Sequence, residues 1–189
     1  TSTVGILGSG FQARTQLEAI TCVLNISQAQ VYSPNIEHRT AFAQLMTEFL
    51  DLPVISVNSN QTLVLDNQIT VCIATNTDPI VLGEWLKPGV TVIGAGPANW
   101  RYPEVDEAGI AKITRIYVDS LEQAKYEAGD LSLAVSKGII QWNQIGELRH
   151  LVSGESIARQ SETDIIYAKL MGTGVADVAA AMLAYESAK

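Results

Sequence analysis

A glycine-rich turn between a short apolar strand and an amphipathic helix is the feature that most limits how this chain can fold. Residues 3–7 (TVGIL) are apolar, and the sequence GSGFQA follows at residues 8–13. One face of a helix comes next, marked by apolar residues at spacings of four, three and four: Ala13, Leu17, Ile20 and Leu24. A strand, a G-x-G-x-x-A turn and a helix in this order are typical of the first unit of a parallel α/β sheet.

The same alternation of apolar runs and helical stretches continues along the chain. Further strands are expected at residues 30–33, 54–57, 69–74, 90–93 and 116–118. Strands that are apolar along their whole length are buried on both faces, which indicates a parallel sheet covered by helices on each side. The sequence therefore predicts the α/β class, with a Rossmann-type doubly wound, mostly parallel sheet and helices on both faces.

The pattern weakens beyond residue 120. Ser120 and Gln123 have the spacing of a capping box, and Lys137-Gly138 has the character of a helix end. A final Ala-rich helix is expected around residues 175–185. We expect residues 1–160 to form one domain and residues 161–189 to form a strand and helix that pack back on it.

Charge and composition exclude several classes of protein. Twelve Lys and Arg residues against 20 Asp and Glu give a formal net charge of −8, which disfavours binding to nucleic acid. No apolar run approaches the roughly 18 residues that span a bilayer, so we expect a cytoplasmic protein with no membrane contact. Cys22 and Cys72 are interpreted as small buried hydrophobic residues, and the isolated His38 and His150 give no metal-ligand spacing.

The turn at residues 8–13 carries the clearest chemical signal. Gly8 would allow the tight turn, Gly10 would let the backbone approach a pyrophosphate, and Ala13 would let the helix pack on the strand. The free N–H groups where Ser9, Phe11 and Gln12 lead into the helix would bind phosphate oxygens. The alternative is a glycine-rich turn that binds no ligand.

The end of the second strand bears on the choice of nucleotide. An Asp or Glu at this place accepts hydrogen bonds from the adenosine ribose of NAD, but this chain has Ser33. A neutral hydroxyl does not repel a 2′-phosphate, and Arg39 is near enough in sequence to approach one. These residues favour NADP(H) slightly over NAD(H). The alternative for Arg39 is an exposed arginine at a helix start.

Several segments, taken in order, resemble the ornithine cyclodeaminase/μ-crystallin family. They are GSGFQAR, VYSPNIEHR, ATNTDPI, KPGVTVIGAG, YVDSLEQA, GDL and KLMGTGVADVAAAMLAYESA. The resemblance runs nearly from end to end. It implies an NAD(P) site made of these residues: Gly8, Ser9, Gly10, Phe11, Gln12, Ala13, Ser33, Arg39, Thr75, Asn76, Thr77, Gly94, Ala95, Gly96, Gly172 and Gly174.

The resemblance implies an NAD(P)-binding domain of a cyclodeaminase-like oxidoreductase or cyclodeaminase. Family members act on amino acids or cyclic imines as cyclodeaminases, amino-acid dehydrogenases or ketimine reductases, and the cofactor carries the hydride. A rival interpretation is a non-catalytic NAD(P)-binding protein of the crystallin kind. Both interpretations predict that the chain binds a nicotinamide dinucleotide.

Two departures from the family pattern affect the expected activity. Relatives carry a segment of about a domain's length before the glycine-rich turn, which supplies most substrate contacts and a dimer interface. We therefore expect the chain to be a fragment, an excised domain or a truncated gene product that binds cofactor without turnover. A third interpretation is a domain that exposes apolar surface and pairs with a second copy. Active cyclodeaminases also place an Asp in the loop that here is residues 96–101 (GPANWR), so no catalytic residue is assigned.

The remaining polar candidates have competing structural interpretations. Glu104 and Asp106 are candidates for proton transfer, but we favour charge interactions at a helix start. Asp119 and Asp177 are likewise interpreted as residues of helix starts, and Lys169 as an edge-strand lysine that discourages aggregation. The tryptophans are interpreted as core or partly buried residues: Trp85, Trp100 and Trp142.

Overall fold

The structure is a computed structural model that describes residues 2–189. The strands are β1 (Ser2–Leu7), β2 (Ile26–Tyr32), β3 (Val54–Ser56), β4 (Ile69–Cys72), β5 (Thr91–Gly94), β6 (Arg115–Val118), β7 (Ile145–Glu147) and β8 (Ile166–Lys169). The helices are α1 (Phe11–Val23), α2 (Ile36–Leu50), α3 (Asn60–Asp66), α4 (Glu107–Lys112), α5 (Leu121–Glu127), α6 (Gly129–Ser136), α7 (Leu148–Val152) and α8 (Gly174–Ser187). Short 3-10 helices lie at Gly83–Trp85 and Trp142–Gln144.

All strands belong to one parallel sheet, in the order β3-β2-β1-β4-β5-β8-β6-β7. Strand β8 is the last in the chain, yet it lies between β5 and β6, with Ile166 beside both Thr91 and Arg115. The last strand of the chain therefore has an interior position in the sheet. The predicted Rossmann-type α/β class is confirmed.

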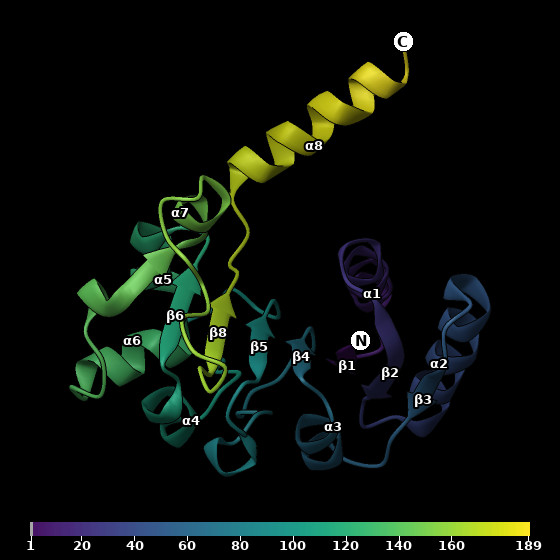
Figure 1. Cartoon of the computed structure of the whole chain (residues 1–189), viewed down its shortest axis with the longest axis horizontal. Coiled ribbons are helices and arrows are strands. Elements are labelled where there is room, and N and C mark those ends of the chain that lie inside the picture. The colour runs from purple at the N-terminus through teal and green to yellow at the C-terminus, as the bar shows by residue number, and fades with distance from the viewer. Residues whose placement is uncertain (1) are drawn as a thin grey trace.

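Helices cover the sheet on both faces. Strand β1 shows why: Val4 and Ile6 pack with Ala13 and Leu17 of α1 on one face, whereas Leu7 belongs to the core on the other. Figure 1 shows α1 above the row of strands and α3 and α4 below it. Burial on both faces explains why these strands have no polar alternation in the sequence.

Most predicted elements are present, with shifted ends. Strand β2 begins at Ile26, four residues before the expected start; this part was missed because the polar residues Ser27 and Gln28 interrupt the apolar run. Ser120 caps α5 as predicted, accepting a hydrogen bond of 3.3 Å from the Gln123 N–H, and Lys137 ends α6. Strand β7 was missed since it is only three residues long.

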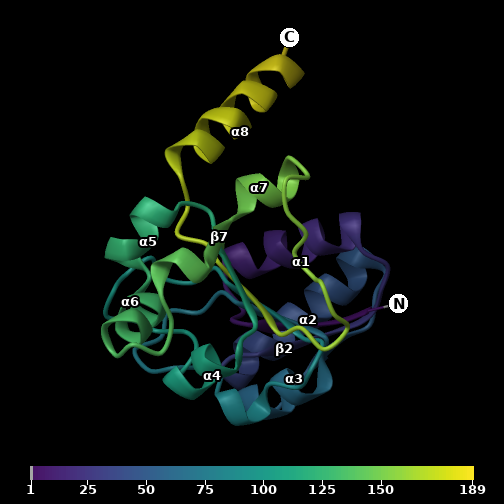
Figure 2. The ribbon, with the colours of Figure 1, turned by 60° about the vertical axis from the view of Figure 1, so that its left-hand side comes forward.

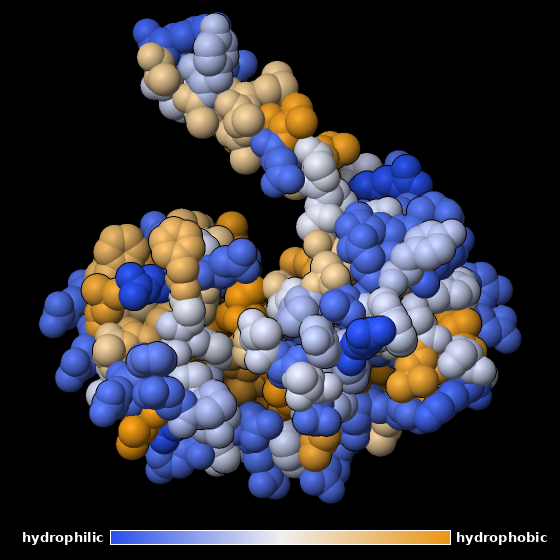
Figure 3. Space-filling model, turned by 180° about the vertical axis from the view of Figure 1, so that it is seen from behind, coloured by the Kyte–Doolittle hydropathy of each residue, from blue (hydrophilic) through white to orange (hydrophobic). Residues whose placement is uncertain are grey.

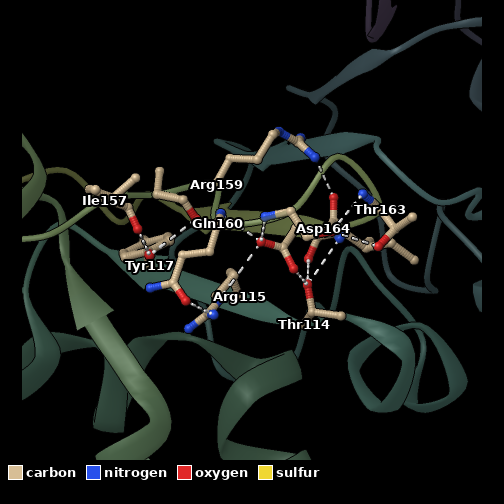
Figure 4. Close-up of polar contacts among 11 residues, drawn as sticks. Thr114, Arg115, Tyr117, Ile157, Arg159, Gln160, Thr163 and Asp164 are labelled. Atoms are coloured by element: carbon tan, nitrogen blue, oxygen red, sulfur yellow. Dashed lines mark hydrogen bonds and ion pairs between the residues drawn. The ribbon is translucent and has the colours of Figure 1, made fainter.

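A loop of residues 153–165 leads from α7 to β8 and is fixed beside β6 by polar contacts (Figure 4). Asp164 accepts hydrogen bonds from the N–H groups of Gln160 and Ser161 at 2.8 and 2.9 Å. These two N–H groups lower the pKa of the Asp164 carboxyl below its usual value. The Tyr117 hydroxyl of β6 donates to the Ile157 carbonyl at 3.3 Å, and Arg115 at the start of β6 pairs with Asp164 at 3.9 Å, so the loop is attached to β6 at two places.

Helix α8 stands away from the rest of the molecule (Figures 1 and 2). All its residues are exposed, including large apolar side chains such as Val175, which is 81% exposed. Seen from behind, the surface is hollowed between α8 and the lobe opposite it (Figure 3). Of residues 161–189, the strand thus packs into the sheet and the helix projects from it. The domain boundary at residue 160 and pairing with a second copy stay predictions.

Two further sequence predictions concern membranes and cysteines. Among residues 2–189, no helix combines the length and the apolar character needed to cross a membrane. Cys72 is buried at the end of β4 as predicted. The prediction for Cys22 was wrong, because this residue lies on the exposed side of α1.

Candidate functional site

Loops from five adjacent strands line one edge of the sheet. Since β2, β1, β4, β5 and β8 are neighbours and parallel, their carboxyl ends meet at the same edge, where ligands of open α/β sheets bind. The residues predicted to bind the cofactor lie at the end of β5, in these loops or in the first turn of the helix that follows: Gly8, Ser9, Gly10, Phe11, Gln12, Ala13, Ser33, Arg39, Thr75, Asn76, Thr77, Gly94, Ala95, Gly96, Gly172 and Gly174.

The β1–α1 turn has the geometry of an anion site. Gly8 has a φ of +129°, and a Cβ there would lie 2.6 Å from the Ile73 carbonyl oxygen, so no other residue fits. Gly10 is the N-cap of α1, and no side chain caps this helix. A Cβ on Gly10 would meet nothing within 4 Å, which leaves room for a ligand to approach the backbone. The open helix start favours a negatively charged group.

The loop after β2 is tied to this turn. Ser33 Oγ lies 2.8 Å from Ser9 Oγ, so the hydroxyl at the end of β2 faces the glycine-rich turn. Arg39 is buried and donates hydrogen bonds to the Ser33 carbonyl at 2.8 Å and to Asn58 Oδ1 at 3.3 Å. Its guanidinium also lies over the ring of Tyr32. The alternative of an exposed arginine is therefore wrong. Arg39 is buried, and its hydrogen bonds hold the loop after β2.

A cavity of about 100 Å³ lies between the loops after β1, β2 and β4. Its lining is mainly apolar and consists of Leu7, Gly8, Tyr32, Ser33, Pro34, Asn60, Ala74, Thr75, Asn76 and Ile80. The Asn76 amide nitrogen donates to the Asp78 and Pro103 carbonyls, both at 2.9 Å. Its Oδ1 is buried and has no hydrogen-bond partner among residues 2–189. A buried acceptor without a donor fits a ligand that brings one.

The loop after β5 packs closely against Glu104. A Cβ on Gly94 would lie 2.4 Å from Glu104 Oε2, and a Cβ on Gly96 would lie 2.5 Å from Glu104 Oε1. The Glu104 carboxylate thus fills the space beside the loop at both positions, and a side chain there would displace it. This constraint is independent of any cofactor, whose contact with these residues stays a prediction.

Glu104 and Lys169 form a buried ion pair, contrary to both sequence interpretations. The Lys169 Nζ and Glu104 Oε2 are 2.5 Å apart, and the two residues are 1% and 0% exposed. Lys169 lies on β8, inside the sheet, so it is not an edge lysine. Glu104 is not a residue of the helix start, because Asp106 is the N-cap of α4 and accepts from the Gly109 N–H at 2.8 Å.

Burial and neighbouring charges perturb this cluster. Burial raises the pKa of Glu104 to about 7, although the charge of Lys169 opposes this. Burial disfavours the Lys169 ammonium, but the charges of Glu104 and Asp130 outweigh it and raise the pKa of Lys169. Tyr167 donates to Asp130 Oδ2 at 2.5 Å beside the pair, and burial raises the pKa of its hydroxyl. The ammonium therefore stays charged at neutral pH.

Asp119 holds the loop after β8. Its Oδ2 accepts hydrogen bonds from the N–H groups of Met171 and Gly172 at 2.9 and 2.7 Å. Gln123 of α5 donates to the Gly172 carbonyl at 3.0 Å. Asp119 directly precedes the N-cap of α5, as predicted, but its carboxylate also fixes a loop 53 residues away.

Replacing Asp119 by asparagine is expected to lower the free energy of unfolding by about 2 kcal/mol, because one charged acceptor serves two N–H groups. Urea titration measures this loss, and hydrogen exchange at the Met171 and Gly172 amides should accelerate. The control is Asp177→Asn, which changes an exposed residue in the first turn of α8 and should cost less than about 0.5 kcal/mol. Equal losses in both variants would contradict a role for Asp119 in holding the loop.

The tryptophans and the histidines were also considered in the sequence. Trp85 is buried and Trp142 partly buried as predicted, but Trp100 is 61% exposed, with Arg101 over its ring. Among residues 2–189, no three His, Cys, Asp or Glu side chains gather as a metal site. His150 Nδ1 lies 2.6 Å from Glu155 Oε2.

The sequence profile of the ornithine cyclodeaminase/mu-crystallin family matches residues 1–189. The chain belongs to this family. The Δ¹-pyrroline-2-carboxylate reductase of Bacillus cereus is 33% identical over 187 residues, covering 98% of this chain and 57% of the relative. The rat ketimine reductase mu-crystallin is 32% identical over 184 residues, covering 96% and 54%. The resemblance predicted from the sequence is confirmed.

A solved structure of the cyclodeaminase/mu-crystallin family has nearly the same backbone. The Δ¹-pyrroline-2-carboxylate reductase of Thermococcus litoralis, in complex with NADH and L-proline, is 32% identical with a TM-score of 0.95. The match covers 100% of this chain and 58% of that one. The chain thus spans slightly more than half the length of these family members.

Proposed function

We propose that the chain is the NAD(P)-binding part of an oxidoreductase. The observation that carries the proposal is the open β1–α1 turn, where Gly10 leaves space above an uncapped helix start. The similarity to pyrroline-2-carboxylate and ketimine reductases supports a reaction at the carbon–nitrogen bond of an amino acid or cyclic imine. When bound, the dinucleotide supplies the hydride for this reaction.

The residues present fit such a cofactor along the whole edge of the sheet. The N–H groups at the start of α1 would hold the diphosphate, and the apolar walls beside Tyr32 and Pro34 would take the adenosine end. Asn76 would accept a hydrogen bond from the ligand with its unpartnered Oδ1. The loops at Gly96 and Gly172 lie farther along the edge, so they would border the nicotinamide end.

The end of β2 supports a slight preference for NADP(H). Ser33 brings no negative charge, and its hydroxyl pairs with Ser9. The Arg39 guanidinium lies beneath the same loop, bound to the Ser33 carbonyl, and adds a positive charge near the ribose position. The reductase of T. litoralis was solved with NADH, so both nucleotides belong in the test.

Titration with NADPH and NADH tests the proposal. Both should bind, with NADPH severalfold tighter, and a nucleotide at 100 times its dissociation constant should add about 2.7 kcal/mol to stability. The control variant is Ser33→Asp, whose carboxylate should weaken NADPH roughly tenfold and spare NADH. If neither nucleotide binds, the function is refuted. If wild type prefers NADH, only the argument from Ser33 and Arg39 is lost.

A further inference from the structure

The Glu104–Lys169 ion pair joins three segments at the carboxyl edge. Glu104 lies in the segment that enters α4, and its Oε1 accepts a hydrogen bond of 2.8 Å from the Gly96 N–H in the loop after β5. Its Oε2 pairs with Lys169, the last residue of β8. Because both side chains are buried beneath the loop, they act on it from the protein side.

The Glu104 carboxylate packs closely against the loop at Gly94–Gly96. The two carboxylate oxygens occupy the space that Cβ atoms of Gly94 and Gly96 would need. The backbone adds a further contact, since the Leu170 N–H donates to the Gly94 carbonyl at 2.8 Å. A small movement of the carboxylate therefore forces a movement of the loop, or removes the acceptor of the Gly96 N–H.

Stability alone does not account for a buried ion pair. Removing two charges from water costs several kcal/mol per ion, and apolar side chains of similar size often stabilise a protein as well or better. A pair kept at this cost is better explained by what it positions. Here it positions the loop between the β4 and β8 loops, at the end of the edge away from the diphosphate turn.

We propose that Glu104 and Lys169 are positioning residues that hold the loop at Gly94–Gly96 in the shape that receives the nicotinamide half of the cofactor. This inference rests on the proposed function. If the inference is correct, loss of the ion pair weakens binding of the nicotinamide half of the cofactor and leaves binding of the adenosine and diphosphate half unchanged.

The test compares the affinities of NADH and ADP-ribose, which lacks the nicotinamide. In Glu104→Gln, the amide has one acceptor oxygen and cannot accept from both the Gly96 N–H and Lys169, so NADH should bind at least about tenfold more weakly while ADP-ribose changes less than about twofold. The matched control is Glu107→Gln, which breaks the nearby, partly exposed ion pair of Glu107 with Lys137 on the surface of α4. This control should leave both affinities as in wild type.

A second variant separates positioning from folding. Glu104→Met with Lys169→Met replaces the pair by apolar side chains, which should restore the melting temperature but not NADH affinity, because the Gly96 N–H still lacks its acceptor. Equal losses for NADH and ADP-ribose, or no loss, would overturn the inference. Failure of wild type to bind either ligand would instead refute the proposed function.

Discussion

Replacing Gly10 by valine is expected to weaken NADH binding at least about 100-fold, equivalent to about 2.7 kcal/mol, while the melting temperature changes by only a few degrees. The backbone of Gly10 has φ −82° and ψ −173°, which any residue adopts. A Cβ there meets no protein atom within 4 Å, so the fold has no reason to change. The isopropyl group would instead occupy the space through which a diphosphate approaches the start of α1.

Valine at Gly8, two residues earlier, is expected to have a much larger effect on stability. In Gly8→Val, the side chain would be forced into a backbone with φ +129° and against the Ile73 carbonyl, so the protein itself should lose several kcal/mol of stability. Isothermal titration with NADH and thermal unfolding distinguish the two variants. A Gly10→Val protein that is folded and binds NADH like wild type would show that the diphosphate does not rest on this turn.

Local signals in the sequence were enough for the fold class and for the loops of the candidate site. The apolar runs, the helical spacing after Gly10 and the cap at Ser120 each depend on residues within one turn or strand, which a single sequence displays. Parallel pairing then brings the carboxyl ends of the strands together, whatever the details of the loops.

Contacts between residues far apart in the sequence could not be predicted from these local signals. Lys169 was misinterpreted because its partner Glu104 is 65 residues away, and because nothing in the sequence shows that β8 enters the middle of the sheet. Arg39 likewise contacts Asn58 in another loop. A hint existed in the sequence GAG at residues 94–96, since glycines at the end of a buried strand indicate a close neighbour.

Replacing Lys169 by methionine is expected to make stability strongly dependent on pH. The variant leaves the Glu104 carboxyl buried without the positive charge of Lys169 and near Asp130, Tyr167 and Cys72. Breaking a buried ion pair from one side costs about 3–5 kcal/mol when the remaining group stays charged. At pH 9 the variant should be less stable than wild type by about this amount.

The sign of the pH effect follows from the pKa of Glu104. In wild type it is already raised to about 7, so the folded protein binds this proton more tightly than the unfolded chain, and stability falls as pH rises from about 4.5 to 7. Without Lys169 the pKa rises further, and the loss continues above pH 7 at about 1.4 kcal/mol per pH unit. Well below pH 7 both folded proteins hold Glu104 protonated, so their difference in stability becomes constant.

Urea unfolding of both proteins between pH 6 and 9 measures this difference. Asp164 and Glu147 have lowered pKa values, so their contributions are lost as pH falls, but they are the same in both proteins and cancel. The control is Lys169→Met combined with Glu104→Gln, which removes the titrating group. Between pH 6 and 7 wild type should lose about 1 kcal/mol relative to this control as Glu104 ionises, and above about pH 8 the difference between the two should stay constant. Parallel curves for wild type and Lys169→Met would mean that Glu104 is uncharged in the folded protein, and that a hydrogen bond rather than an ion pair joins it to β8.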